Sequence, residues 1–305
     1  MSHPSERPSQ HRLLPYLGMA AGIVALGFSA IFVRWAGAPG PVTGFYRLAI
    51  ASLVLLPFAL ARHGLPTRWP AAGSRWAILG GVFLAVDIAL WNTSVGMTSA
   101  ANATLFANMA PLWVALGAWL VFREKLAGRF WLSLFLTLSG AAAVLGLDFS
   151  THITLGLGDL LAMSASLFYA GYFLMTQQGR KHLGPLAYVW LAGMASSVVL
   201  LGVSAAAGLP LVGYPPQSWL AFLGLALITQ VVGYVAVGYA LGHLPASLVA
   251  PTMVGQPVVT ALLAIPILGE KLSLVQWLGG AAVLVGIYLV HRSPRAVGHQ
   301  PSAVS

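Results

Sequence analysis

A repeat with an offset of 146 residues constrains this chain more than any other feature. Each half holds a small residue, a proline within an apolar stretch, the tripeptide Glu-Lys-Leu, a tryptophan and a late glycine. In the first half these are Ala100, Pro111, Glu124, Lys125, Leu126, Trp131 and Gly140, and in the second half they are Ala246, Pro257, Glu270, Lys271, Leu272, Trp277 and Gly286. Two apolar halves built on one pattern are typical of membrane transporters, in which the binding site lies between the repeats.

Long apolar stretches identify the chain as an all-α integral membrane protein. Of its 305 residues, 58% are hydrophobic and 7% are charged, whereas a soluble domain carries about 25% charged residues. Apolar stretches of roughly 20 residues, which suffice to cross a bilayer as a helix, cover most of the length. We predict ten transmembrane helices, at approximately residues 13–35, 42–61, 75–96, 101–122, 129–147, 155–177, 184–207, 218–241, 246–268 and 273–291.

The repeat divides these helices into two groups of five. We predict a first repeat over residues 13–147 and a second over residues 155–291, flanked by polar tails at 1–12 and 292–305. Of the 15 Lys and Arg residues, twelve fall on the side of the N-terminus and two on the other side, so both termini are expected in the cytoplasm. Because five crossings is an odd number, the second repeat enters the membrane in the opposite direction. Such inverted repeats suit alternating access.

The composition argues against several other functions. The chain has no cysteine, which rules out disulfides and thiolate metal sites. It has no His-x-x-x-His pair, no glycine-rich phosphate loop and no acidic cluster for a metal-bound diphosphate. The net charge of +9 lies in short loops between spans, so nucleic acid is not an expected partner. We therefore predict no enzyme, no cofactor and no metal. The expected partners are the bilayer and a small-molecule substrate; the oligomeric state stays open, and a monomer is compatible with the sequence.

Two charged residues, Arg47 and Asp87, lie inside predicted spans. A charge in the middle of a membrane costs roughly 2.5–3.5 kcal/mol, so each residue needs a partner or a water-filled cavity. Their depths in the membrane differ by about 6 Å, which long side chains can bridge. Two interpretations are open. Arg47 and Asp87 form a structural ion pair that joins two helices, or Asp87 is a coupling site that binds a proton or a substrate amine.

Polar and aromatic residues recur at helical spacing in the third, fourth, eighth and ninth spans. Rings provide stacking area and amides provide orienting hydrogen bonds, which suits a small amphipathic solute. For any single residue, packing or interhelical hydrogen bonding is the simpler interpretation, but the recurrence across four spans favours a cavity. The candidate substrate-binding residues are Trp91, Asn92, Asn102, Phe106, Met109, Gln230, Tyr234, Met253 and Gln256. Asn108 lies on a neighbouring stripe of its helix, and further candidates from other spans are Tyr46, Tyr169, Tyr172 and Trp190.

Pro111 and Pro257 occupy matched positions in the fourth and ninth spans. Proline removes a helical hydrogen bond and bends the helix. Matched helix bends would free backbone carbonyls beside the cavity and provide points of flexing. A purely structural bend explains the two prolines equally well.

The repeated segments resemble those of the EamA-type members of the drug/metabolite transporter superfamily. In residues 100–146 and 246–289, each segment has a small first residue, a mid-helix proline, an apolar run into Glu-Lys-Leu, a tryptophan and a glycine-rich last helix. The tripeptide Phe-Tyr-Arg at 45–47 and the dipeptide Gly-Asp at 158–159 are also similar to that family. The resemblance implies ten helices in two inverted five-helix repeats and the export of small metabolites. Amino acids, including aromatic ones, are frequent substrates in that group.

We therefore predict a secondary transporter in a bacterial cytoplasmic (inner) membrane that exports amino acids, including aromatic ones, by alternating access. One alternative is a multidrug or organic-cation exporter of the same superfamily, in which Asp87 pairs with the substrate. Another is an integral-membrane lipid-modifying enzyme, although the sequence lacks the reactive cluster at one interface that such an enzyme needs. A facilitator needs no coupling ion, whereas a proton antiporter needs a titratable group, for which Asp87 is the candidate.

Overall fold

The computed structural model of the chain describes residues 10–66, 69–98, 100–121, 123, 126–145, 156–268 and 272–292, and every regular element in these ranges is a helix. Eight helical stretches are long and apolar enough to cross a membrane, and two shorter apolar stretches, Gly128–Val144 and Ala246–Val259, bring the set to ten. The predicted all-α membrane fold with ten spans is therefore confirmed. The Glu-Lys pairs of the sequence repeat lie outside the described residues.

Several of the ten spans are interrupted, so the helical segments outnumber the spans. The first repeat contains α1 (Gln10–Gly27), α2 (Ser29–Ala36), α3 (Gly40–His63), α4 (Ala71–Val95), α5 (Ala100–Ala107), α6 (Ala110–Leu120) and α7 (Gly128–Val144). The second contains α8 (Leu157–Gly179), α9 (Pro185–Ala206), α10 (Pro216–Gly224), η2 (Leu225–Tyr234), α11 (Val235–Leu241), α12 (Ala246–Met253), α13 (Gln256–Leu268) and α14 (Leu274–Arg292). Helix α1 begins inside the N-terminal segment that we predicted as a tail, and α14 ends at the first residue of the predicted C-terminal tail.

Helix ends follow the glycine and proline residues of the sequence. Gly37 ends α2 in the left-handed conformation, with φ of 57°, which a residue without a Cβ atom adopts without strain. Proline occupies the first turn of α3, α6, α9 and α10, where its missing N–H removes no helical hydrogen bond. The connections that these residues form are short, so consecutive spans cross the molecule back and forth.

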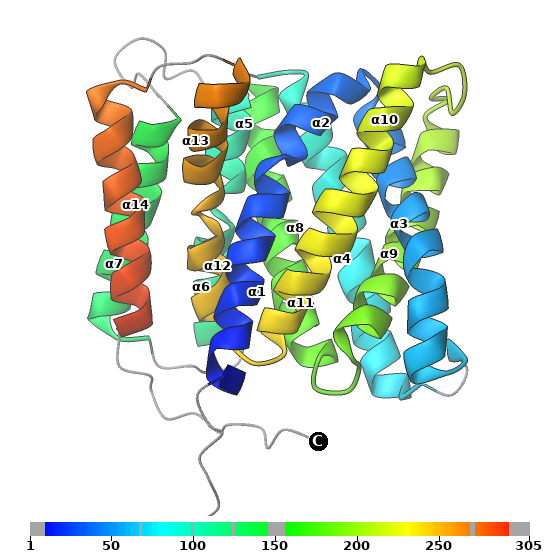
Figure 1. Cartoon of the computed structure of the whole chain (residues 1–305), viewed down its shortest axis with the longest axis horizontal. Helices are drawn as coiled ribbons and strands as arrows, with labels where there is room; N and C mark the ends of the chain where they lie inside the picture. The colour runs from blue at the N-terminus through cyan, green and yellow to red at the C-terminus, as the bar shows by residue number, and fades with distance from the viewer. Residues whose placement is uncertain are drawn as a thin grey trace, which may run out of the picture.

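The two repeats run through the molecule in opposite directions (Figure 1). In the first repeat α5 lies at the upper end of the view and α6 at the lower end, whereas α12 lies at the lower end and α13 at the upper end. Helices α5 and α12 have eight residues each and begin 146 residues apart, at Ala100 and Ala246. The structure therefore has the inverted arrangement that the odd number of spans predicted.

Helices from both repeats pack against each other. Helix α4 packs against α8 and α9, α1 packs against η2 and α11, and α7 pairs with α14 at one edge of the molecule (Figure 1). At the α7–α14 crossing, a Cβ atom on Gly140 would lie 2.6 Å from the carbonyl oxygen of Gly279. Small residues therefore allow the two backbones to touch, which is how membrane helices associate closely.

Candidate functional site

Each repeat has a break in the middle of the corresponding span. Helix α5 ends at Ala107 and α6 begins at Ala110, while α12 ends at Met253 and α13 begins at Gln256. The two breaks are 146 residues apart, so they occupy equivalent positions of the sequence repeat. Because the repeats are inverted, the two interrupted helices run in opposite directions through the molecule (Figure 1).

A proline follows each break. Pro111 stands in the first turn of α6, and Pro257 is the second residue of α13. Because proline has no N–H, the carbonyl groups of Ala107 and Met253, four residues earlier, cannot form the usual helical hydrogen bond to it. Interrupted helices whose ends meet at the membrane midplane are the common way in which transporters expose backbone groups to a solute.

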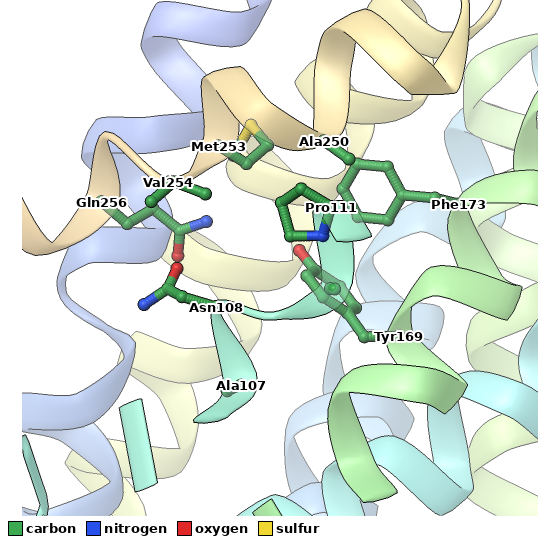
Figure 2. A pocket seen from close by; sticks show the side chains of 10 residues that line it. Ala107, Asn108, Pro111, Tyr169, Phe173, Ala250, Met253, Val254 and Gln256 are labelled. Atoms are coloured by element: carbon green, nitrogen blue, oxygen red, sulfur yellow. The ribbon is translucent and has the colours of Figure 1, made fainter. Parts of the chain in front are cut away.

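A small cavity of about 20 Å³ lies between the two breaks. Its walls come from both interrupted spans and from α8 (Figure 2). The lining residues are Ala107, Asn108, Ala110, Pro111, Tyr169, Phe173, Ala250, Met253, Val254 and Gln256. Figure 2 shows the amide groups of Asn108 and Gln256 pointing toward each other from opposite repeats. This volume holds about one water molecule, so a solute can enter only when the surrounding helices move apart.

The ends of four helices surround this cavity and give it polarity. Turn hydrogen bonds such as Met109 N to Phe106 O and Gly255 N to Thr252 O, both 3.1 Å, pair part of the backbone at the two breaks. The carbonyls that face a proline, those of Ala107 and Met253, favour a positive group, and the positive ends of the α6 and α13 dipoles favour a negative group. Between them lie the apolar surfaces of Tyr169, Phe173 and Met253. A small solute that carries both signs of charge and an apolar side chain fits this combination.

A second group of polar side chains is buried beside the cavity. Nε of Arg47 on α3 donates a hydrogen bond of 3.0 Å to Oε1 of Gln230 on η2, and the guanidinium lies 5.1 Å from the centre of the Tyr234 ring. Arg47, Asp87 and Gln230 are 5%, 8% and 1% exposed. We call Arg47, Asp87, Gln230 and Tyr234 the buried polar cluster. It joins α3 and α4 of the first repeat to η2 of the second.

Arg47 and Asp87 interact electrostatically inside this cluster. Within the described part of the chain, however, they form no direct salt bridge, and the hydrogen bond of Arg47 goes to Gln230. Arg47 is therefore joined to another helix by its hydrogen bond to Gln230, and not by the ion pair with Asp87 that was one of the two predictions from the sequence. Whether Asp87 couples transport to protons stays a prediction.

Tyr169 adjoins both the cavity and the buried polar cluster. It lines the cavity, and its side chain interacts electrostatically with that of Tyr234. Its ring stacks nearly parallel to that of Tyr172, with centroids 6.4 Å apart, and Tyr172 packs against Tyr234 at 5.6 Å. One tyrosine side chain therefore stands between the solute cavity and the buried charges.

The π-helical stretch η2 carries two members of the cluster, Gln230 and Tyr234. It replaces ordinary α-helix between α10 and α11 in the eighth span. A π-helical turn contains more residues than an α-helical turn, and such turns are frequent at functional sites. The extra residue per turn changes which side of the helix each side chain occupies. The inward positions of Gln230 and Tyr234 therefore depend on η2.

The structure distributes the predicted substrate-binding residues over several places. Met253 and Gln256 line the cavity, together with Pro111. Gln230 and Tyr234 belong to the buried polar cluster and do not line the cavity itself.

The other predicted residues lie outside both groups. Asn92 donates a hydrogen bond of 2.9 Å to the Gly40 carbonyl, which is the interhelical bonding that the sequence left open as the simpler interpretation. Trp91 is half-buried, and its indole Nε1 has no hydrogen-bond partner among the described residues. Phe106, near the end of α5, and Met109, within the first break, are half-buried and do not line the cavity. Asn102 belongs to α5, but its side chain is not among those described.

Phe173 and Ala250 line the cavity although the sequence analysis did not single them out. Phe173 follows Tyr169 by four residues, and this spacing places both rings on one face of α8. The spacing was a usable signal, but it identifies a lining face only when it is known that α8 packs against the two breaks. Asn108 lines the cavity and lies within the break itself. Helical spacing does not continue through the break, so it could not show which way the Asn108 side chain points.

Comparison with known proteins gives a family match, two relatives and a solved structure with a similar fold. The EamA-like transporter family model matches residues 13–146 and 156–292. An uncharacterized transporter of Archaeoglobus fulgidus is 28% identical over 272 residues, which cover 88% of this chain and 93% of that protein. The uncharacterized transporter YwfM of Bacillus subtilis is 27% identical over 263 residues, with coverage of 83% and 84%. One solved crystal structure has the same fold, with a TM-score of 0.76 at 17% identity over 90% of this chain and 96% of its own.

Proposed function

The chain belongs to the EamA-like transporter family, and from this premise we propose that it exports amino acids, including aromatic ones, across the cytoplasmic membrane by alternating access. The observation that carries the proposal is the cavity between the two helix breaks. Its apolar wall of Tyr169, Phe173 and Met253 suits an amino-acid side chain. The helix ends and the amides of Asn108 and Gln256 suit its ammonium and carboxylate groups.

The inverted repeats support alternating access. Each repeat contributes one interrupted helix to the cavity, so a tilt of one repeat against the other opens the cavity toward one side while closing it toward the other. The two breaks lie where such a tilt concentrates backbone rotation. The bias of Lys and Arg toward the side of the N-terminus supports an orientation with both termini in the cytoplasm.

Asp87 favours organic cations as the second candidate substrate class. It is a buried carboxylate that forms no salt bridge with Arg47 among the described residues, so a cationic substrate would find an acceptor there. The relatives of this chain are transporters, so it is not an enzyme.

Counterflow in proteoliposomes tests the proposal. Vesicles with purified protein are loaded with one unlabelled amino acid, and uptake of labelled Phe, Trp, Thr and Met is followed against empty vesicles and against labelled tetraphenylphosphonium. Saturable amino-acid uptake with mutual competition is expected. Uptake of the cation alone would replace the proposal by the organic-cation alternative, and no uptake of either by folded protein would end both.

Asp87→Asn separates a facilitator from a proton antiporter, because the substitution removes the titratable group while keeping nearly the same shape. If Asp87 couples transport to protons, the variant should lose the dependence of amino-acid uptake on an imposed pH gradient but retain counterflow, which needs no net proton movement. Unchanged pH-gradient dependence in a folded variant would exclude the coupling role.

A further inference from the structure

Two hydrogen-bond donors in the buried polar cluster have no acceptor. In the part of the chain that the structure describes, Nη2 of Arg47 and Nε2 of Gln230 are buried without a partner. The two side chains are already joined by the bond from Arg47 Nε to Gln230 Oε1, so the unpaired donors are held close together. Buried polar groups in proteins are nearly always paired, and an unpaired charged donor is the most costly kind.

The geometry of the guanidinium indicates which acceptor is missing. Nε and Nη2 are the two parallel donors of one guanidinium edge, which matches the two oxygens of a carboxylate. Gln230 occupies only one of them, because its Oε1 accepts from Nε. The Gln230 amide then has a free N–H of its own. An acceptor with a single negative charge and two oxygens pairs with Nη2 of Arg47 and Nε2 of Gln230 together.

We propose that Arg47 and Gln230 bind the carboxylate of the transported amino acid. The inference rests on the proposed function and adds the residues that recognise one group of the substrate. Asp87, on the neighbouring helix, then faces a substrate that also carries an ammonium group. A zwitterion thus brings a carboxylate for Arg47 and an ammonium group for Asp87, and it adds no net charge to the membrane interior. To reach the cluster from the cavity, the carboxylate must displace Tyr169 from its position against Tyr234.

Arg47 and Asp87 occur in only one of the two repeats. This difference favours a ligand-binding role for the two charges over a role in forming the fold. The counterparts of α3 and α4 in the second repeat are α9 and the span of α10, η2 and α11, and none of these helices contains an Asp, Glu, Lys or Arg. The second repeat therefore forms the same helices without either charge. Because Arg47 belongs to the first repeat and Gln230 to the second, a carboxylate bound to both also links the two halves that move in alternating access.

Gln230→Glu tests the inference, because the new carboxylate beside Arg47 occupies the guanidinium edge permanently. The matched control is Gln178→Glu, since Gln178 also accepts a hydrogen bond from a cation, Lys181 Nζ at 2.7 Å, but at an exposed contact outside the cavity. Arg47→Lys is the second variant, because lysine keeps the charge but lacks the parallel donor edge. All variants are purified in detergent, and their folding is checked by size-exclusion chromatography.

Binding is measured as the ligand-induced increase in melting temperature, with three probes. These are L-phenylalanine, phenylacetate (the carboxylate without the ammonium) and phenethylamine (the ammonium without the carboxylate). We expect the wild type and Gln178→Glu to bind phenylalanine and phenylacetate, and Gln230→Glu to bind both about tenfold more weakly or worse, as the loss of a charged hydrogen bond implies. Arg47→Lys should weaken the two carboxylates and leave phenethylamine unchanged.

Three results would overturn the inference: neither carboxylate binds the wild type, phenethylamine binds as well as phenylacetate does, or Gln230→Glu binds both carboxylates like the wild type. The last result would mean that water satisfies the two donors. Failure of the proposed function is distinguishable. If the wild type shows no amino-acid counterflow but binds phenylacetate in a manner sensitive to Gln230→Glu, the carboxylate site stands and the substrate is another monocarboxylate. If counterflow occurs and Gln230→Glu leaves it unchanged, the function stands and the carboxylate site falls.

Discussion

Gly140→Ala should destabilise the protein, because it places a methyl group between two backbones. The new Cβ atom would lie 2.6 Å from the carbonyl oxygen of Gly279 and 2.8 Å from the backbone nitrogen of Val283. Neither atom belongs to a side chain that can rotate away, so α7 and α14 must separate. Such overpacking costs about 1–3 kcal/mol, while alanine gains about 0.5–1 kcal/mol over glycine within a helix. The net expectation is a loss of about 1 kcal/mol in unfolding free energy.

The chain contains a matched control and a symmetry-related test. At Gly202 in α9, an added Cβ atom would meet nothing within 4 Å, so Gly202→Ala should keep only the helix-propensity gain. Gly286, the equivalent of Gly140 in the second repeat, would place its Cβ atom 2.9 Å from the backbone nitrogen of Thr137. Gly286→Ala should therefore be destabilised like Gly140→Ala.

Thermal unfolding of the purified variants in one detergent checks this expectation. Gly140→Ala and Gly286→Ala should melt a few degrees below the wild type, as about 1 kcal/mol implies for a protein of this size. Gly202→Ala should melt at the wild-type temperature or above it. If Gly140→Ala melted as high as Gly202→Ala, the close approach of α7 and α14 would be refuted, along with the argument that glycine is needed there.

Three further substitutions test the cavity and the contacts at the end of α8. Asn108→Leu and Gln256→Leu should each reduce amino-acid counterflow about tenfold, because each removes a hydrogen bond to the substrate; Gln178→Leu, outside the cavity, should leave counterflow unchanged. Burial lowers the pKa of Arg180 to about 10, so its guanidinium stays protonated at neutral pH and donates to the carbonyls of Gly238, at 2.8 Å, and Leu183. Arg180→Gln should therefore lower the unfolding free energy by about 1.5–3 kcal/mol, and an unchanged melting temperature at pH 7 would show that these bonds contribute nothing.

The limits of prediction from sequence are clearest in the interrupted spans. Pro111 and Pro257 drew attention to the fourth and ninth spans, because proline acts on its own helix and its effect is therefore visible locally. The eighth span has no such residue in its π-helical part, so helical periodicity gave no sign that η2 would place Gln230 against Arg47. Tyr169 and Phe173 had the spacing of one helix face, but nothing local identified which neighbour that face would meet.

The membrane-spanning class, the ten spans, the inverted repeats and the presence of buried charges can all be predicted from the sequence. These properties follow from hydrophobic length, from the number of crossings and from the cost of a charge in lipid, each of which depends on one stretch of chain at a time. In contrast, the hydrogen bond from Arg47 to Gln230, 183 residues away, and the position of α8 at the cavity between the two breaks follow only from the packing of the helices. Those contacts depend on how far each helix rotates about its axis and where it crosses its neighbours. Rotation and crossing are set by side chains on other helices.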